Sequence, residues 1–280
     1  MVVSSLASYA AFLAVGSYAL TPLLVASLAL QSYSLLRASW GAGCIEVIAI
    51  AYPAGLALSV VTALVRARIL ARGATEIGVV GGVRVYLCSS RTAASTFFPM
   101  SSIFVSRALA YVLSDRELKA VILHEYGHRS SPYRFANLAI AVLATLCIAA
   151  SIALAIAGPS IEFALSAVMP IYSSLVALKC SSWIFEHVAD EAAARAGLGV
   201  ELCTSLIKVY ACSRLGKLCS PEVLEAVASP RSVATLAQGF SPLKTLILLA
   251  LPTPWLHPPL EARVWRVTTR LTRYYLYSPA

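Results

Sequence analysis

Residues 114–128 of the chain read SDRELKAVILHEYGH, and this stretch decides what kind of fold surrounds it. Ser114 and Glu117 have the spacing of a capping box, in which each side chain binds the backbone amide of the other at the start of a helix. On such a helix His124 and His128 lie four residues apart, so their imidazoles project from one face. The stretch therefore predicts a helix that carries two neighbouring histidines.

The second half of this helix has the His-Glu-x-x-His pattern of zinc peptidases. Two of the four histidines of the chain, His124 and His128, belong to it. Their Cβ atoms are expected about 6 Å apart, near enough for both rings to reach one ion at about 2.0–2.1 Å. Glu125 lies to one side of the pair, where it can take a proton from water. The alternative is a pair of packed or surface histidines without a metal.

A third ligand is needed, because catalytic zinc takes three protein ligands and leaves a fourth position for water. Glu186 and Asp190 are four residues apart on one helical face, with His187 rotated by about 100° from Glu186. We expect Glu186 to bind the metal and Asp190 to accept a hydrogen bond from a ligand imidazole. Two alternatives remain open here: His187 replaces Glu186 as ligand, or the two carboxylates form a solvated face.

The fourth histidine opens the sequence His257-Pro258-Pro259-Leu260. The two prolines predict a stiff extended segment that leads into a helix. In that position His257 can donate a hydrogen bond to the oxyanion of a tetrahedral intermediate. The arginines of the following helix predict a basic face, which either rests on lipid headgroups or is solvated: Arg263, Arg266, Arg270 and Arg273.

The composition indicates an integral membrane protein. The chain of 280 residues is 59% hydrophobic and 12% charged, with a mean hydropathy of +0.78, whereas about a quarter of the residues of soluble domains are charged. The net charge of +9 comes from basic residues scattered beside apolar stretches, so the predicted partner is the lipid bilayer and not a nucleic acid. The seven cysteines include no Cys-x-x-Cys pair, and we expect them to be reduced.

Four stretches approach the roughly 20 apolar residues that a membrane-spanning helix needs; they fall within residues 6–30, 44–64, 135–157 and 163–178. They divide the chain into two N-terminal transmembrane helices (1–70), a protease part with the motif helix (71–134), a transmembrane hairpin (135–182) and a C-terminal part (183–280). Residues 76–88, around Gly81-Gly82, predict a β-hairpin. Residues 245–251 are apolar but too few to cross.

The distribution of basic residues predicts which side of the membrane the site faces. The segment between the second and third stretches is rich in arginine, whereas the connection from residue 158 to 162 has no Lys or Arg. Because basic residues favour the cytoplasmic side, we expect a multi-pass protein of the plasma membrane whose site faces the cytoplasm.

The ordered motifs, preceded by Ile103-Phe104-Val105-Ser106, resemble those of the membrane zinc endopeptidases that include the HtpX heat-shock proteases, a gluzincin-type group related to the CAAX prenyl proteases. The resemblance covers the chain from about residue 100 onward. It implies a mainly α, polytopic membrane protein with about four transmembrane helices and a gluzincin-type zinc protease domain that carries a small β-hairpin or sheet. The roles that it implies are zinc ligands for His124, His128 and Glu186, base for Glu125, support for Asp190 and transition-state stabilisation for His257.

The expected function is that of a zinc-dependent endopeptidase, in which Glu125 activates a zinc-bound water to cleave misfolded membrane or membrane-associated polypeptides at the cytoplasmic face. Four spans favour the HtpX type over a CAAX-type processing protease, which remains an alternative. So does a non-enzymatic membrane adaptor with a structural metal site, although a structural zinc needs no base. Ser89 to Phe98 lacks the asparagine typical of the family's substrate-aligning strand, so no substrate-binding residue is assigned.

Overall fold

The structure, a computed structural model, describes residues 71–89, 94–96, 102–130, 133–157, 161–215, 221–251 and 257–277, together with residues 61, 64, 65, 68 and 69. The chain forms two compact units. Of the described residues, 135–157, 161–182 and 242–251 belong to unit 1, and the others belong to unit 2. The predicted span within residues 6–30, and most of the one at 44–64, lies outside the described residues.

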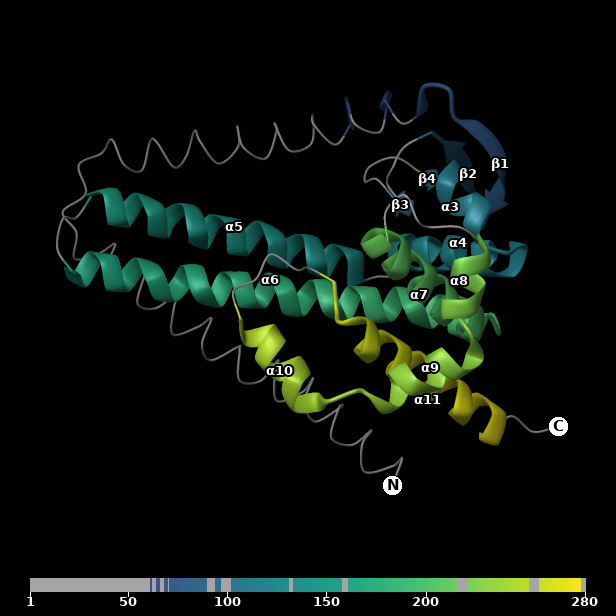
Figure 1. Ribbon diagram of the computed structural model, residues 1–280. Helices are drawn as coiled ribbons and strands as arrows, with labels where there is room; N and C mark the ends of the chain where they lie inside the picture. Colours follow the sequence, from purple (N-terminus) through teal and green to yellow (C-terminus); the bar gives the residue numbers. More distant parts are fainter. Residues whose placement is uncertain are drawn as a thin grey trace. The chain divides into compact units, whose positions relative to one another are not determined.

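Unit 2 contains a small four-stranded sheet (Figure 1). Its strands are β1 (Thr75–Val80), β2 (Val83–Cys88), β3 (Ala94–Thr96) and β4 (Ser102–Ser106), in the spatial order β1-β2-β4-β3. β1 and β2 are antiparallel and Val80 pairs with Val83, which leaves Gly81-Gly82 as a two-residue turn. Both glycines have positive φ values, 55° and 77°, which such a turn requires. The predicted hairpin is confirmed.

β4 is the buried inner strand that leads toward the motif helix. It runs parallel to β2 and antiparallel to β3. Because β3 is the last strand in the spatial order, it is an edge strand. Ile103, Phe104 and Val105 are at most 1% exposed, which explains why this run is apolar without alternation. The segment Ile103-Phe104-Val105-Ser106, on which part of the family resemblance rests, therefore belongs to a strand. Two helices follow it, α3 (Arg107–Val112) and α4 (Asp115–Ser130).

The motif helix α4 begins with the predicted capping box. The Ser114 amide donates to Glu117 Oε2 at 2.9 Å, and the Glu117 amide donates to Ser114 Oγ at 3.4 Å. One face of α4 packs on the sheet, where a core cluster is formed by Val83, Val85, Ile103, Val105, Leu109, Leu113 and Val121. This packing fixes α4 against the sheet, and the histidines His124 and His128 are not part of this cluster.

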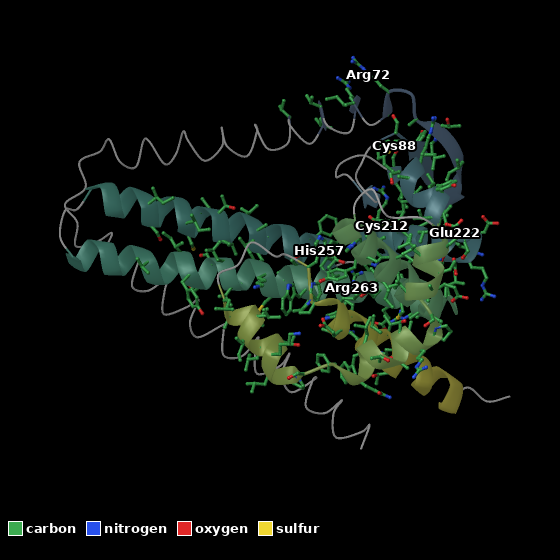
Figure 2. The ribbon with its side chains drawn as sticks, viewed as in Figure 1. Arg72, Cys88, Cys212, Glu222, His257 and Arg263 are labelled. Atoms are coloured by element: carbon green, nitrogen blue, oxygen red, sulfur yellow. The ribbon has the colours of Figure 1, made fainter. Side chains whose placement is uncertain are left out.

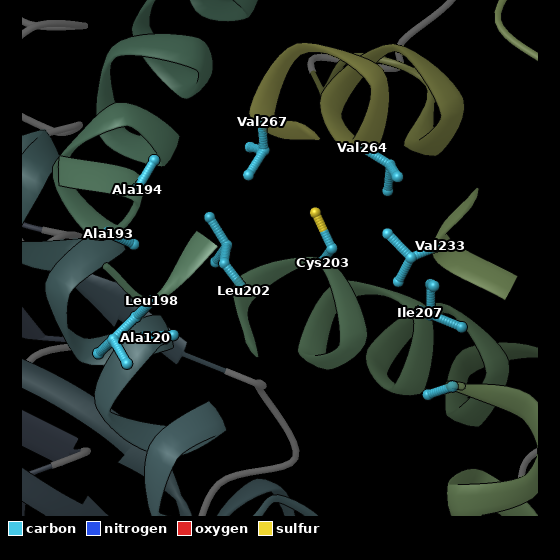
Figure 3. Packing of buried hydrophobic residues seen from close by; sticks show 11 residues of the cluster. Ala120, Ala193, Ala194, Leu198, Leu202, Cys203, Ile207, Val233, Val264 and Val267 are labelled. Atoms are coloured by element: carbon cyan, nitrogen blue, oxygen red, sulfur yellow. The ribbon is translucent and has the colours of Figure 1, made fainter. Parts of the chain in front are cut away.

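The rest of unit 2 is helical. It contains the second part of α6 (Ile161–Arg195), α7 (Gly199–Leu215), α8 (Pro221–Val227), α9 (Pro230–Gln238) and α11 (Leu260–Tyr277). Figure 3 shows the main core between these helices and α4, formed by Ala120, Ala193, Ala194, Leu198, Leu202, Cys203, Ile207, Ala228, Val233, Val264 and Val267. Burial of these side chains holds the helices that carry the two halves of the site in one body.

A buried ion cluster joins the start of α4 to α7 and α8. Lys208 on α7 is 1% exposed, and its Nζ lies 2.8 Å from Glu117 Oε2 and also binds Glu225 on α8. The capping carboxylate of Glu117 therefore has a second role as the counterion of a buried lysine. The spacing of Ser114 and Glu117 in the sequence predicts the capping role alone.

Unit 1 contains α5 (Tyr133–Ala157), apart from its first two residues, the first part of α6 and α10 (Pro242–Ala250). Both predicted stretches, 135–157 and 163–178, are helical, the first in α5 and the second in α6 (Figure 1). α6 also holds the end of α10: Lys179 Nζ binds the carbonyl oxygens of Leu248 and Leu251, and the Tyr172 hydroxyl donates to that of Ala250 at 2.7 Å.

Within the described residues, no helix taken singly has the length and apolar character needed to cross a membrane, whereas α9 and α10 meet that criterion only as a pair. The four spans and the boundaries of the four segments stay predictions.

The cysteines differ from the expectation at one position. Cys88, Cys147, Cys180 and Cys203 are free, but Cys212 in α7 is disulfide-bonded. The expectation that all seven cysteines are reduced is therefore wrong for Cys212. The reason is that the spacing of cysteines along a chain does not reveal which of them meet in space.

Candidate metal centre

The two motif histidines direct the same ring atom toward each other. Nε2 of His124 lies 3.1 Å from Nε2 of His128, and their side chains are only 9% and 12% exposed. Two zinc–nitrogen bonds of about 2.0–2.1 Å at a tetrahedral angle place the nitrogens about 3.3 Å apart. The separation in the structure is close to that value.

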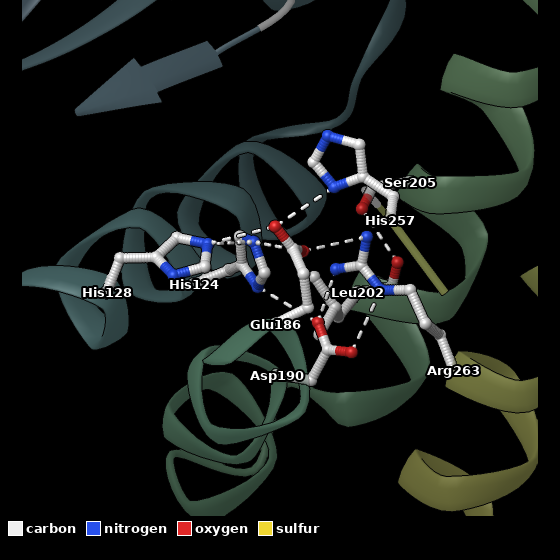
Figure 4. Close-up of polar contacts among 8 residues, drawn as sticks. All are labelled: His124, His128, Glu186, Asp190, Leu202, Ser205, His257 and Arg263. Carbon is white, nitrogen blue, oxygen red and sulfur yellow. Dashed lines mark hydrogen bonds and ion pairs between the residues drawn. The ribbon is translucent and has the colours of Figure 1, made fainter. Parts of the chain in front are cut away.

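Glu186 on α6 completes a three-residue cluster (Figure 4). Its Oε2 lies 3.6 Å from His124 Nε2, and its Oε1 lies 3.5 Å from His128 Nε2. One ligand atom from each of the three residues lies within 4.8 Å of the other two. Two imidazole nitrogens and one carboxylate oxygen are the donor set of a catalytic zinc with an open fourth position. The three side chains fit a metal ion, and they are the residues that can hold one.

Gly127 explains how α4 and α6 come close enough for these ligands to meet. A Cβ atom at this position would lie 2.9 Å from Cα and O of Ala189 and 2.9 Å from Cβ of Ala192. Real Cβ atoms do not approach backbone atoms so closely. The two helices are therefore in backbone contact beside the cluster, and only glycine permits this approach.

Asp190, one helical turn beyond Glu186, orients the first histidine. Its Oδ1 lies 2.9 Å from Nδ1 of His124, and the side chain is 1% exposed. A carboxylate in this position fixes the ring so that Nε2 faces the other two candidate ligands. Nδ1 of His128 is buried and has no hydrogen-bond partner in the part of the chain that the structure describes; the His128 ring instead contacts the Phe185 ring, with centroids 4.6 Å apart.

Arg263 on α11 is a site residue that the sequence analysis missed. Its Nε and Nη2 donate to the two carboxylate oxygens of Asp190 at 2.9 and 2.5 Å, and its Nη1 lies 3.2 Å from Glu186 Oε2. The predicted basic surface of α11 is wrong for this residue, which is 8% exposed. The sequence contains one signal for this role. Arg263 lies in the first turn of the helix that follows His257, so it stays close to the site while later residues of that helix lead away from it.

The guanidinium governs the ionisation of both carboxylates. Burial raises the pKa of Glu186 and of Asp190, but the charge of Arg263, together with the neighbouring histidines, outweighs burial and holds both pKa values well below their usual range. Conversely, burial lowers the pKa of Arg263, but the negative charges of Asp190 and Glu186 outweigh burial and raise that pKa. Both carboxylates are thus ionised at neutral pH, as ligation and hydrogen bonding to imidazole require.

The two histidines differ in their surroundings. Burial, followed by the neighbouring His124, lowers the pKa of His128 to about 3, so this ring is neutral at pH 7 and can offer a lone pair to a metal. Burial also acts to lower the pKa of His124, but the hydrogen bond and charge of Asp190 outweigh it and raise that pKa.

His257 reaches the cluster from the segment before α11. Figure 2 shows it near Arg263, and in Figure 4 one ring nitrogen faces Glu186 while the other points away. The first is Nδ1, 3.0 Å from Glu186 Oε1, and the side chain is 74% exposed. The hydrogen bond to Glu186 raises the pKa of His257. The residue lies beside the three candidate ligands with one nitrogen accessible.

Two further predicted residues are buried in this region. Glu125 is 9% exposed, and its charge contributes to the raised pKa of Arg263. His187 is 1% exposed, and burial lowers its pKa to about 3. His187 is not a member of the ligand cluster, so among the described residues the carboxylate of Glu186 is the candidate for the third donor.

The comparisons with known proteins agree with this geometry. The family model described as "Peptidase family M48" matches residues 65–271, which include every residue of the cluster and most of the chain. The match confirms the resemblance to HtpX-like zinc metalloproteases. No match was found among the curated proteins or the solved structures.

Proposed function

We propose that this chain, which belongs to peptidase family M48, is a zinc-dependent endopeptidase that cleaves misfolded membrane or membrane-associated polypeptides at the cytoplasmic face of the plasma membrane. Membership of the family indicates a metallopeptidase. The observation that carries the proposal is the meeting of His124, His128 and Glu186, whose ligand atoms lie within 4.8 Å of one another.

The residues around the cluster have complementary tasks in peptide hydrolysis. A zinc ion held by the three ligands supplies a Lewis acid that polarises a carbonyl group and lowers the pKa of water. Glu125 takes the proton from the attacking water and passes it to the leaving amine, a contribution of about 10²–10⁴-fold in rate. Asp190 holds His124 in the orientation described above, and Arg263 holds Asp190 and Glu186.

His257 is suited to stabilise the negative charge that develops on the carbonyl oxygen. Glu186 holds its Nδ1, and the exposed side chain leaves Nε2 accessible to substrate. A donor in this position acts mainly in the transition state, where loss of a comparable hydrogen bond costs about 10²–10³-fold in turnover.

The edge strand β3 supports a mode of substrate binding. β3 pairs with β4 alone among the described strands, and it contacts the motif helix α4. An extended polypeptide can add to such an edge through backbone hydrogen bonds. This mode accepts many side-chain sequences, as expected for an enzyme that degrades misfolded proteins.

The membrane location is supported by composition and charge. The chain is 59% hydrophobic and 12% charged, and residues 158–162, which comprise the connection from α5 and the start of α6, contain no Lys or Arg. Basic residues instead flank the motif helix, as they do in segments on the cytoplasmic side.

Hydrolysis of an unfolded polypeptide by the purified full chain tests the proposed activity. We expect the zinc-loaded protein to cleave internal peptide bonds, a chelator to stop cleavage and zinc to restore it. Glu125→Gln should lower turnover at least about 100-fold while one zinc per chain is retained. Glu76→Gln, at an exposed position of β1, is the matched control and should cleave normally.

Three results would lead to other conclusions. Normal turnover of Glu125→Gln would show that another group is the base. Zinc binding by a wild-type protein that cleaves nothing would favour the structural metal site of an adaptor. Cleavage restricted to prenylated C-terminal peptides would indicate a CAAX-type processing protease.

A further inference from the structure

Helix α10 presents a row of apolar side chains at the protein surface. Four large side chains along α10 and at its end are between 43% and 66% exposed: Leu243, Leu246, Ile247 and Leu251. Their spacing of three, four and eight residues places them on one side of the helix, whereas Thr245 and Leu249 are 3% and 6% exposed. A continuous exposed apolar face of this kind is typical of contact with an apolar partner.

The C-terminal end of α10 has an unusual set of hydrogen-bond partners. The last carbonyl groups of a helix lack partners within the helix and are commonly left to water. Here Lys179 binds the carbonyl oxygens of Leu248 and Leu251, and Tyr172 donates to that of Ala250. Lys179 is 3% exposed, so the group that binds these carbonyl oxygens is a buried ammonium group.

The exposed apolar face and the internally paired helix end have one common explanation. In hydrocarbon no water is present, so every backbone polar group must find a partner within the protein. Lysine side chains in that environment pair with backbone carbonyl groups, as Lys179 does. In water a continuous apolar face of four large side chains would be unfavourable.

We propose that α10 is inserted into the hydrocarbon layer of the bilayer and that lipid acyl chains cover its apolar face. This inference rests on the membrane location proposed above. α10 has nine residues and is about 13.5 Å long, against about 30 Å for the hydrocarbon layer, so it enters the bilayer without crossing it. Lys244 in its first turn is exposed and reaches the headgroups, which places the Leu251 end deeper.

A photo-crosslinker at α10 tests the insertion in the full chain. Ile247→p-benzoylphenylalanine places the probe on the apolar face, and the matched control is Val200→p-benzoylphenylalanine, an exposed apolar position of α7 in unit 2. The two side chains are 52% and 45% exposed. Both proteins are reconstituted into phosphatidylcholine–phosphatidylglycerol vesicles, floated and irradiated. We expect acyl-chain adducts at position 247 to exceed those at position 200 at least about fivefold.

Each outcome of this experiment decides one question. If the protein floats with the vesicles but both positions give equal or no lipid adducts, the insertion of α10 is wrong and the membrane location stands. If the protein does not float, the location fails and the insertion fails with it. An adduct between two chains at position 247 would show that a second copy covers the face, which also overturns the inference.

Amide hydrogen exchange provides a second measurement that does not depend on the crosslinker. In reconstituted protein that still binds zinc, Lys179→Met should accelerate exchange in residues 246–251 at least about tenfold, because the helix end loses the bonds that hold its carbonyl groups and opens more often. Lys244→Met is the control and should leave exchange unchanged. Unaltered exchange in Lys179→Met would show that these bonds do not stabilise the helix end, contrary to the inference.

Discussion

Arg263 is the residue on which the acidic side of the metal centre depends. It contacts the carboxylates of Asp190 and Glu186, and all three side chains are buried. A buried carboxylate without a partner costs several kcal/mol, so Asp190 can remain ionised beside His124 only while the guanidinium is present. Arg263 thereby positions His124, a candidate metal ligand, through an intermediate carboxylate.

Replacement of Arg263 measures this dependence. Arg263→Met should lower the free energy of unfolding by about 3–5 kcal/mol, because it leaves Asp190 buried and unpaired. Denaturant titration of the detergent-solubilised full chain measures the change. Adding Asp190→Asn to the variant should recover part of the loss, and Arg231→Met, an exposed position of α9, is the control. An unchanged midpoint for Arg263→Met would refute the role.

Glu117 predicts a pH dependence of stability outside the metal centre. Burial raises its pKa, but hydrogen bonds from Lys208, the Ser114 amide and Thr204 outweigh burial and hold the pKa below its ordinary value of 4.5. A carboxyl whose pKa is lower in the folded state stabilises that state fully above its unfolded pKa, and this stabilisation is lost as the pH falls through the folded pKa.

Glu117→Gln should therefore cost about 1–3 kcal/mol at pH 7, and the difference from wild type should shrink below about pH 4.5. Denaturant titrations of both proteins between pH 7 and pH 3 measure it. Glu225→Gln is the comparison, because the Glu225 side chain is 67% exposed and its replacement should cost less. A difference that stays constant with pH would show that the Glu117 charge is not involved.

At the scale of elements, the contact between α4 and α6 sets the distance between the two halves of the site. Gly127→Ala would force the helix backbones apart, because the added methyl group meets the Ala189 backbone at 2.9 Å. We expect a loss of about 1–3 kcal/mol in the free energy of unfolding and weaker zinc binding, measured by denaturation and by competition with a chromogenic chelator.

The matched control is Gly78→Ala, at a strand position where an added Cβ meets no atom within 4 Å. It should change stability by about 0.5 kcal/mol or less. Combining Gly127→Ala with Ala192→Gly should restore only part of the loss, since the contact with the Ala189 backbone remains. Full restoration would place the crowding at the Ala192 side chain instead of between the backbones.

A structural element could be predicted when the residues that determine it lie close together in the sequence. The capping box at Ser114 and the Gly81-Gly82 hairpin each depend on residues close together in the sequence, and both were predictable. β3 has three residues, too few to show an alternating pattern, and its pairing with β4 is a tertiary contact. The anchoring of α10 by Lys179 joins residues about 70 positions apart, so no local pattern indicates it.

At the scale of the whole molecule, zinc binding should be linked to folding. Zinc at about 100 times its dissociation constant should raise the free energy of unfolding of the stripped chain by about 2.7 kcal/mol. His128→Ala should abolish this increase. His257→Ala should keep it and lose turnover, because His257 contacts Glu186 without belonging to the ligand cluster. If zinc stabilised His128→Ala as much as it stabilises the wild-type chain, the ion would bind at another site.

The composition of the site was predictable where spacing on a helix brings residues together. Each of the pairs His124/His128 and Glu186/Asp190 lies within one helix, so only the meeting of α4 and α6 had to be inferred. Arg263 was not assigned, because its neighbours Arg266 and Arg270 suggested a common surface, and only its place in the first turn of α11 distinguishes it from them. The disulfide at Cys212 has the same cause, a contact that sequence spacing does not record.

The four buried charged side chains of the centre have a consequence for the kind of ion it accepts. Glu125, Glu186 and Asp190 carry three negative charges, and Arg263 returns one positive charge. When His124, His128 and His257 are all neutral, two negative charges remain, and a bound divalent cation would cancel them. A monovalent ion would leave the interior negative and a trivalent ion would leave it positive, each at an electrostatic cost in a medium that screens poorly. Discrimination by valence is thus built into the enclosed side chains before any difference in ionic radius acts.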